Sequence, residues 1–394
     1  MRFYESIKAI SENTLKTAKQ DSFAGYDPFD GLNSTFFSVF PRLKKGLFGL
    51  CWIQFNKRSL INFRPMLGVP KKRNPKGIAL FILGLIEQYR YNKDDAYLQQ
   101  AIQLGDWLLH QQCSKEEWGN ACWGYHFDWN ARAFYVPKGK PNVITTIYVS
   151  QALFALSEVT HNRKYSEPAL DAAAFIVNIL YNDKEGQKYF SYIPGEKAFV
   201  HNASLWGAAW VAKVANLTGN DDYKQLAIDV ALQSVKAQRD DGSWVYGTRH
   251  HHQFVDGFHT GYNLEALQMI KESLGVDIFD SAISKGLTYY KTHLFEEDGT
   301  AKYYNNNRYP LDMHSVSQAV FTLLRVGKTD EDIELAKKIV ETSVRQLYRQ
   351  SSGLFSYQKY RHIKNNTNYI RWTQAWVYYS FLFLLNYGTY HEKD

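Results

Sequence analysis

Acidic and imidazole side chains recur at one kind of position in this chain, where a polar loop meets an apolar helical stretch. Asp256 and His259 open one such stretch, Asp312 and His314 open another, and His201 opens a third. A spacing of three residues puts Asp256 and His259 on one face at the start of a helix. Carboxylate and imidazole groups commonly transfer protons in enzymes. The pattern therefore predicts acid–base chemistry, and the alternative is a set of helix caps with buried histidines.

A second pair of carboxylates, Asp27 and Asp30, lies in a loop punctuated by proline and glycine. Two carboxylates that face a sugar can act as general acid and general base in glycoside hydrolysis, and their separation decides between inversion and retention. The alternative is a turn followed by a helix cap, because Asn33 and Ser34 precede an apolar run. We therefore include Asp27 and Asp30, with Asp256, His259, His201, Asp312 and His314, among the candidate catalytic residues.

Aromatic turns lie just before these positions and return five times along the chain. The copies are Trp123–Tyr125, Phe190–Tyr192, Trp244–Tyr246, Tyr303–Tyr304 and Phe355–Tyr357. Recurrence every 55–60 residues or so is typical of a repeated supersecondary unit, here two helices and a loop. Tyrosine and tryptophan suit sites that have one apolar face and one wet edge. The repeat therefore predicts a rim of side chains that bind a carbohydrate.

The candidate substrate-binding residues are aromatic or cationic side chains in these loops and at the helix starts. They are Trp123, Tyr125, His126, Trp244, Tyr246, Arg249, Tyr262, Arg371 and Trp372. Arg371 and Trp372 supply a cation and a stacking surface. Helix N-termini carry partial positive charge, so a rim of them favours an anionic sugar. Ordinary loop packing is the alternative for the aromatic members.

The segment Gln238–Trp244 resembles the glutamine–tryptophan loops of terpenoid-cyclase and prenyltransferase toroids, which tie helix ends together. A prenyltransferase would need a zinc constellation and a cyclase a DxDD-type acid motif, and neither occurs in position. Three consecutive histidines, 250–252, point in different directions and seldom ligate one metal together. We therefore expect a structural loop here, no metal site and no cofactor.

Two kinds of helical stretch alternate along the chain. Apolar stretches, expected inside a barrel, cover 78–86, 147–156, 205–215, 264–270, 316–324 and 375–385. Amphipathic stretches, expected outside, cover 97–109, 169–180, 223–235, 279–290 and 333–347. The N-terminal stretch 3–19 can supply the sixth outer helix. The pairs predict an all-α fold, an (α/α)6 toroid or barrel of helical hairpins with short β-hairpins in the rim loops and adjacent chain ends.

We expect one domain over residues 1–394, in which 25–74 is an elaborated segment that lies across the rim. The net charge is +7, and basic residues cluster at 42–45 and 71–73. Such clusters fit solvent, a membrane surface, or an acidic or lipid-linked saccharide. The apolar stretch 46–55 fits a buried or an interfacial helix. No zinc finger or RNA-binding signature occurs, so nucleic acid is not an expected partner.

The three cysteines, Cys51, Cys113 and Cys122, are odd in number and form no CxxC motif. This usage favours a reducing compartment. The N-terminus shows no apolar region of the kind that secretory signals carry. The longest apolar run, 375–385, is too short to span a bilayer. We therefore expect a cytoplasmic protein, with peripheral membrane association as a further expectation.

The segments 26–31 (YDPFDG) and 256–262 (DGFHTGY) resemble those of the VpsJ-type exopolysaccharide-biosynthesis proteins, and the resemblance extends over the whole chain. More broadly, the chain looks like the six-hairpin glycosidase, polysaccharide-lyase and sugar-epimerase toroids. The resemblance implies a carbohydrate-active enzyme of bacterial exopolysaccharide, surface-polysaccharide or O-antigen metabolism.

Four functions stay open at this point, led by a hydrolase that cleaves a glycosidic bond through the carboxylate candidates. A uronate lyase or epimerase would need a charge neutraliser, from Arg249, Arg371 or Asn202. It would also need a proton carrier, from His201, His259, Tyr246 or Tyr262. A sugar isomerase similar to the N-acylglucosamine 2-epimerases would use the rim histidines. The fourth function is glycan binding without chemistry.

Overall fold

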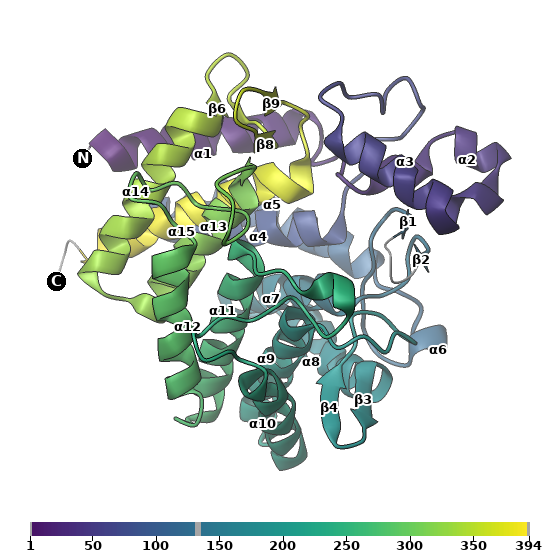
Figure 1. Cartoon of the computed structure of the whole chain (residues 1–394), viewed down its shortest axis with the longest axis vertical. Coiled ribbons are helices and arrows are strands. Elements are labelled where there is room, and N and C mark those ends of the chain that lie inside the picture. Colours follow the sequence, from purple (N-terminus) through teal and green to yellow (C-terminus); the bar gives the residue numbers. More distant parts are fainter. Residues whose placement is uncertain (1, 131–134, 392–394) are drawn as a thin grey trace.

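The computed structural model describes residues 2–130 and 135–391. Within these residues, successive long helices belong alternately to an inner and an outer ring (Figure 1). The inner helices are α4 (Pro75–Asn92), α7 (Val143–Thr160), α9 (His201–Thr218), α11 (Gly257–Leu274), α13 (Met313–Thr322) and α15 (Ala375–His391). The outer helices are α1 (Arg2–Gln20), α5 (Asp95–His110), α8 (Arg163–Phe175), α10 (Asp221–Lys236), α12 (Asp280–His293) and α14 (Asp330–Leu347). Each inner helix packs against the next, and α15 packs against α4, so the ring closes. The predicted (α/α)6 toroid is confirmed.

The apolar pattern of each helix explains its ring. Helix α9 buries nearly every residue from His201 to Ala212, because neighbouring helices cover all its sides. Helix α14 buries Ile333, Ala336 and Val340, which lie three or four residues apart on one face. Short turns join inner to outer helices.

The first and last helices complete the sixth hairpin. Helix α1 packs against α15, so the adjacent chain ends expected from the repeat are confirmed. Gly84 of α4 lies against Tyr378 of α15, and a Cβ at this position would be only 2.5 Å from the tyrosine ring. The Asn386 side chain donates hydrogen bonds to the Glu87 carbonyl, 2.8 Å, and to its carboxylate, 2.6 Å. These contacts hold the last inner helix against the first.

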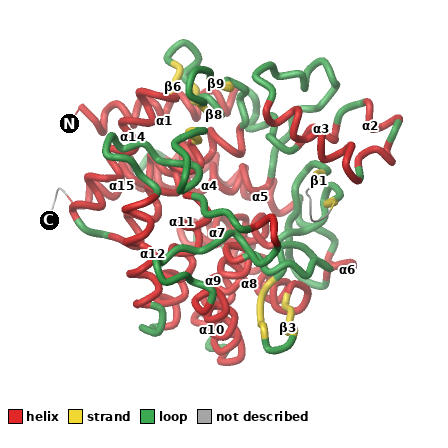
Figure 2. Tube along the Cα trace, in the orientation of Figure 1, coloured by secondary structure: helices red, strands yellow, loops and turns green. Residues whose placement is uncertain are grey.

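The remaining elements are short and lie in the connections (Figure 2). The strands are β1 (Trp129–Asn130), β2 (Tyr135–Val136), β3 (Tyr181–Lys184), β4 (Gln187–Phe190), β5 (Leu311–Asp312), β6 (Tyr348–Arg349), β7 (Leu354–Phe355), β8 (Gln358–Lys359) and β9 (Lys364–Asn365). They pair as antiparallel hairpins, and β5 adds to the β8–β9 hairpin. Single helical turns are α6 (Lys115–Trp118), η4 (His250–His252) and the π-helical η3 (Ile176–Leu180), η5 (Leu323–Gly327) and η6 (Ile370–Gln374). The predicted short β-hairpins are therefore present.

The segment 25–74 folds into four short elements beside one end of the barrel (Figure 1). They are η1 (Asp30–Asn33), α2 (Phe36–Val39), η2 (Pro41–Lys44) and α3 (Gly46–Arg58). The Phe29 ring packs against Trp372 of η6, with ring centroids 5.6 Å apart. Asn365 of β9 donates a hydrogen bond to the Ser59 carbonyl, 2.9 Å. These contacts fix the segment against the loops that precede the inner helices.

Among the described residues, one helix is long and apolar enough to cross a membrane, and that helix is α7. It lies in the inner ring between α4 and α9. Its apolar composition is therefore explained by packing inside the barrel.

Candidate active site at one mouth of the barrel

The first turns of the six inner helices lie at one end of the barrel, and we call this end the mouth. Its side chains come from helix starts and from the aromatic loops before them. The His201 backbone N–H donates to the Tyr246 carbonyl, 3.2 Å, and the Tyr246 ring lies 4.5 Å from the His259 ring. His201 and His259 therefore lie at the same end of the barrel, as the repeat predicts.

Asp256 and His259 form a hydrogen-bonded pair at the start of α11. One carboxylate oxygen of Asp256 accepts the His259 backbone N–H, 2.8 Å, which is the predicted cap. The other oxygen lies 2.7 Å from His259 Nδ1. The Asp256 side chain is 1% exposed and that of His259 is 21% exposed. A carboxylate that accepts from Nδ1 leaves the lone pair on Nε2, so this imidazole can serve as a general base.

A second histidine, His314 at the start of α13, lies among aromatic rings. Its Nε2 is 2.6 Å from the Tyr262 hydroxyl, and its ring packs against Phe258, Trp372 and Trp376 at 4.6–4.7 Å. Burial lowers the pKa of His314 well below its ordinary value. His314 is therefore neutral at physiological pH, and a hydrogen bond joins its Nε2 to the Tyr262 hydroxyl.

Lys76, in the first turn of α4, is a residue that the sequence analysis missed. Its ammonium lies 4.4 Å from the ring centre of Tyr148, 5.2 Å from Trp376 and 5.7 Å from Tyr262. The residue is 3% exposed, and burial lowers its pKa well below the ordinary value. Its one sequence signal was a lysine at the start of an otherwise apolar helix.

Asp27 and Arg371 form a buried ion pair beside Lys76. Arg371 donates from Nε, 2.5 Å, and from Nη2, 2.8 Å, to the two carboxylate oxygens. The guanidinium also lies 5.1 Å from the centre of the Tyr125 ring. His126 Nδ1 lies 3.1 Å from the Asn74 amide, and burial lowers the pKa of His126 to about 3. Both oxygens of Asp27 therefore accept from Arg371, and the carboxylate neutralises that cation.

Asp30 and Asp312 are also occupied by protein partners. Asp30 accepts from Arg64 Nε at 2.5 Å, and both side chains are 1–2% exposed. Asp312 accepts from Gln358, 2.8 Å, and from the Trp372 indole, 3.2 Å. Burial raises the pKa of Asp312 to about 6, although these hydrogen bonds oppose the shift. Both carboxylates hold the loops of the mouth together.

Three of the predicted site residues face the outer helices. His201 Nδ1 lies 3.1 Å from the Ser234 hydroxyl of α10, and burial lowers the pKa of His201 to about 4. The indole of Trp244 donates to the Ser234 carbonyl, and that of Trp123 donates to the Leu108 carbonyl, both at 2.8 Å. In these two copies of the aromatic turn, the first aromatic residue thus joins the turn to the outer helix that precedes it in the chain. The expected structural role of the Gln238–Trp244 loop agrees with the hydrogen bonds from Gln238 to the Gly242 and Ala282 carbonyls.

The other predicted rim residues lie around the mouth. Tyr125 and Tyr192 place their hydroxyls 3.1 Å apart across two neighbouring loops. Arg249 forms an ion pair with Glu196, so its charge is partly neutralised. Tyr246 is half-buried against His259. These side chains form a polar and aromatic border around the Asp256–His259 pair.

Several buried polar atoms without a partner in the described chain lie in the first turns of the inner helices. They include Asn142 Nδ2, Thr145 Oγ1, Asn202 Oδ1, His314 Nδ1, Ser315 Oγ and Trp376 Nε1. Buried polar groups of folded proteins normally have hydrogen-bond partners, including water. At the mouth, water or a hydroxylated ligand can satisfy these atoms. Among the described residues, no group of three or more His, Cys, Asp or Glu side chains could hold a metal ion.

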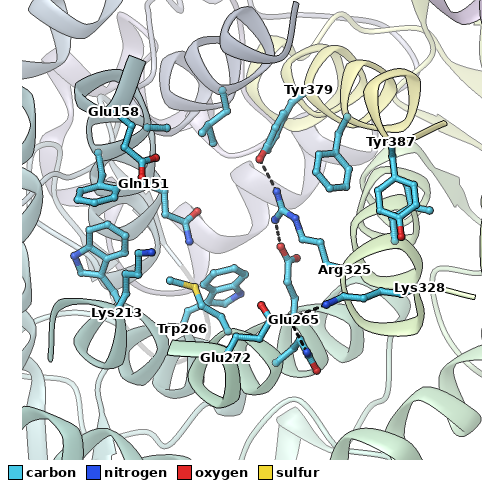
Figure 3. A pocket seen from close by; sticks show the side chains of 18 residues that line it. Gln151, Glu158, Trp206, Lys213, Glu265, Glu272, Arg325, Lys328, Tyr379 and Tyr387 are labelled. Carbon is cyan, nitrogen blue, oxygen red and sulfur yellow. Dashed lines mark hydrogen bonds and ion pairs between the residues drawn. The ribbon is translucent and has the colours of Figure 1, made fainter. Parts of the chain in front are cut away.

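A cavity of about 500 Å³ lies at the other end of the barrel, which we call the far end (Figure 3). Side chains from five inner helices and from η5, which continues α13, line it, and none of them belongs to the predicted site residues. Arg325 forms an ion pair with Glu265 and donates to the Tyr379 hydroxyl, 2.7 Å, while Lys328 pairs with Glu272 at 2.7 Å. Lys213 lies across the cavity from Arg325 in Figure 3. The cavity is therefore bordered by charges that are largely paired with one another.

No family model and no curated protein matches the sequence. Solved structures do match. An unsaturated glucuronyl hydrolase specific for heparin is 12% identical, with a TM-score of 0.67 over 99% of this chain and 98% of that chain. The GH76 alpha-mannanase of Bacteroides thetaiotaomicron is 11% identical, with a TM-score of 0.63 over 81% of this chain and 88% of that chain. The cellobiose 2-epimerase of Bacillus thermoamylovorans is 14% identical, with a TM-score of 0.59 over 82% and 88%.

At these identities the likeness establishes a fold. It extends over at least four fifths of this chain in each comparison. The chain therefore has the six-hairpin (α/α)6 toroid fold of these carbohydrate hydrolases and epimerases.

Proposed function

We propose that this protein is an enzyme that acts on a saccharide, with its reaction centre at the mouth of the barrel. The observation that carries the proposal is the Asp256–His259 pair, in which a buried carboxylate lies 2.7 Å from Nδ1 of a partly exposed imidazole. Such a pair orients the ring and stabilises the imidazolium that forms when Nε2 accepts a proton. The toroid fold shared with carbohydrate hydrolases and epimerases supports a saccharide as substrate.

Proton abstraction next to a carbonyl or carboxylate, as in an epimerase or a uronate lyase, fits this geometry best. His259 would take the proton, and the Tyr262–His314 pair would supply one from its hydroxyl. Each of the four candidate carboxylates has a protein partner: Arg371, Arg64, His259 and Trp372. The reaction proposed here therefore uses imidazole where a typical glycosidase uses a pair of carboxylates.

Hydrolysis of a glycosidic bond is the second candidate. The observation that favours it is the fold likeness to two unsaturated glucuronyl hydrolases over 96% or more of each chain. In that reaction His259 would activate a water, and the Tyr262–His314 pair would supply the leaving-group proton from its hydroxyl.

An acidic saccharide is the substrate class that the charges favour. Lys76 and Lys57 approach the mouth, and no described carboxylate lies within ion-pair distance of either ammonium. Burial lowers the pKa of Lys57 to about 8, and a carboxylate ligand would reverse this shift. We further propose that the protein acts in bacterial surface polysaccharide or O-antigen metabolism, on a lipid-linked substrate. In this proposal it is cytoplasmic and attaches peripherally to a membrane. The three free cysteines are in keeping with that location.

The test is product analysis with purified protein and a panel of uronate-containing and neutral oligosaccharides in heavy water. An epimerase incorporates a deuteron into an isomeric product, a lyase forms a conjugated uronate that absorbs ultraviolet light, and a hydrolase creates a new reducing end. We expect a product of the first or second kind, and its loss in the His259→Gln variant. Saccharide binding without any product would overturn the catalytic proposal.

The variant Lys76→Met tests whether the substrate is acidic. Methionine has a similar shape but no charge, so packing is retained. We expect KM to rise for uronate-containing substrates and to stay unchanged for neutral ones. An equal change for both classes would contradict an acidic substrate.

A further inference from the structure

Large apolar side chains are exposed in one part of this molecule. Thirteen of them are exposed among the described residues, and nine of the thirteen lie between residues 39 and 66. These nine, which we call the apolar face, are Val39, Phe40, Leu43, Leu47, Phe48, Phe55, Leu60, Ile61 and Met66. Exposure reaches 76% at Leu47 and 82% at Met66. Such a concentration of exposed apolar side chains in one segment is typical of an interaction surface on a soluble protein.

Helix α3 shows how the sequence produces this face. Its inward side consists of Gly49, Ile53 and Asn56, which are buried at spacings of three or four residues. Its outward side consists of Leu47, Phe48 and Phe55, which share the opposite face and are exposed. An ordinary surface helix exposes its polar face to solvent, whereas α3 exposes an apolar face. The burial of its inward side is complete, so the outward side is left for a partner.

The charge around the apolar face has one sign. The sequence contains no Asp or Glu from residue 31 to residue 86, whereas residues 36–73 contain nine Lys or Arg. Two of the nine have buried or half-buried partners, because Arg64 pairs with Asp30 and Lys44 with Asp128. Arg42, Lys45 and Arg58 are exposed beside the apolar side chains. A surface that combines apolar groups with unbalanced positive charge is complementary to an anionic lipid leaflet.

We propose that the apolar face inserts into the interfacial region of an anionic membrane and holds the protein there as a peripheral protein. Helix α3 would lie in the plane of the interface, with its outward side chains at the boundary of headgroups and acyl chains. Arg42, Lys45 and Arg58 would contact the lipid phosphates. The short elements α2 and η2 add their own apolar side chains to the same surface, so the contact does not depend on one helix alone.

The membrane would then lie next to the mouth of the barrel. Lys57 of α3 lies 4.7 Å from the centre of the Phe29 ring and 5.8 Å from that of Trp372, which belongs to the mouth. Docking through α3 therefore brings the mouth close to molecules attached to the leaflet. The membrane contact rests on the surface alone. The inference that this contact brings a lipid-linked saccharide to the mouth rests on the proposed function.

The test is sedimentation of the whole protein with vesicles of phosphatidylcholine and phosphatidylglycerol. The variant Leu47→Glu/Ile61→Glu/Met66→Glu alters the apolar face. The matched control Leu217→Glu/Ile278→Glu/Ile363→Glu makes the same change of charge at exposed apolar residues outside the segment. We expect the wild type and the control to bind, and the binding constant of the first variant to fall at least about tenfold. Equal loss in both variants, or no binding by the wild type, would overturn the proposal.

Two further measurements separate the alternatives. The charge variant Arg42→Gln/Lys45→Gln/Arg58→Gln should weaken binding to anionic vesicles by about fivefold per residue removed, and added salt should do the same. In a Cys113→Ser background, an environment-sensitive fluorophore on the exposed Cys51 of α3 should shift to shorter wavelength when vesicles are added. If the face instead joins two copies, the wild type is a dimer in light scattering and the fluorophore shifts with protein concentration without vesicles, which overturns the proposal.

The proposed reaction is tested separately. A soluble oligosaccharide should be converted equally by the wild type and by Leu47→Glu/Ile61→Glu/Met66→Glu, because the apolar face does not touch the Asp256–His259 pair. Vesicle binding without turnover would contradict the function alone, and turnover without vesicle binding would contradict the membrane contact alone.

Discussion

Asp256 uses its two carboxylate oxygens for two different tasks, and the variant Asp256→Asn separates them. The amide oxygen can still accept the His259 backbone N–H, so the cap of α11 is kept. The amide nitrogen is a donor, so Nδ1 must accept and the proton moves to Nε2. The imidazole then has no lone pair toward a substrate. We expect an unchanged melting temperature and a loss of turnover of about 100- to 10,000-fold.

Thermal melting and turnover must be measured on the same preparation. A stable variant with normal turnover would remove the Asp256–His259 pair from the chemistry. An unstable variant would mean that Asp256 acts through the cap and the loop that it holds.

His201 gives the protein a pH dependence of stability whose sign follows from burial. Its ordinary pKa is 6.5, and burial lowers the pKa of the folded state to about 4. Between pH 6.5 and pH 4 the unfolded chain therefore gains a proton at this residue that the folded chain does not. Acidification should lower the free energy of unfolding by up to about 1.4 kcal/mol per pH unit in this window. Above pH 6.5 the contribution should be constant.

The variant His201→Gln isolates this effect, because glutamine can keep a hydrogen bond to Ser234 but does not titrate. Urea unfolding at a series of pH values should show that its stability falls less steeply with acid than that of the wild type. Parallel profiles for the two proteins would show that His201 is accessible to protons in the folded state.

At the scale of elements, Arg64 holds the segment 25–74 to the barrel. It pairs with Asp30, donates to the Asn56 carbonyl, 3.2 Å, and donates to the Tyr369 hydroxyl, 2.8 Å. Arg64→Met leaves the Asp30 carboxylate buried without its partner. Loss of one partner from a buried pair costs about 3–5 kcal/mol. We expect a drop of this order in the free energy of unfolding by denaturant.

The double variant Asp30→Asn/Arg64→Met is the control for this prediction. It removes the uncompensated charge, so part of the lost stability should return. A double variant as unstable as the sum of the two single variants would mean that the two side chains act independently.

The aromatic loops show a second effect at the scale of elements. The sequence repeat gives Trp123 and Trp244 the appearance of rim residues, yet both indoles donate to carbonyls of the preceding outer helices. Tyr125 and Tyr246, two residues further on, lie at the mouth. The repeat thus predicts the loops correctly, and the direction of each side chain depends on the neighbouring hairpin.

For the whole molecule, the two ends of the barrel offer different surfaces, and their roles can be compared directly. Lys213 of α9 borders the far-end cavity and lies twelve residues after His201, which corresponds to about 18 Å along a helix. We expect Lys213→Met and Glu158→Gln to leave kcat/KM unchanged, because neither touches the mouth. The measurement is turnover of the same oligosaccharides. A loss comparable with that of Asp256→Asn would place the reaction at the far end.

The sequence by itself determined the architecture of this protein. Alternating apolar and amphipathic helical stretches and five aromatic turns specify helical hairpins. A repeat of such hairpins must close to cover its apolar helices. The starts of the inner helices at one end follow from the same repeat. Asp256 could be read as a cap because capping depends on residues three apart.

Only the tertiary structure decided which of the charged groups are available for chemistry. Asp27 and Arg371 are 344 residues apart and form one ion pair, so the carboxylate that looked free in the sequence is neutralised. His201 turns toward an outer helix, and Lys76 enters the barrel between aromatic rings from three other helices. Local spacing fixes the face of a helix. It does not fix the partner across the barrel, because that partner is set by closure of the ring.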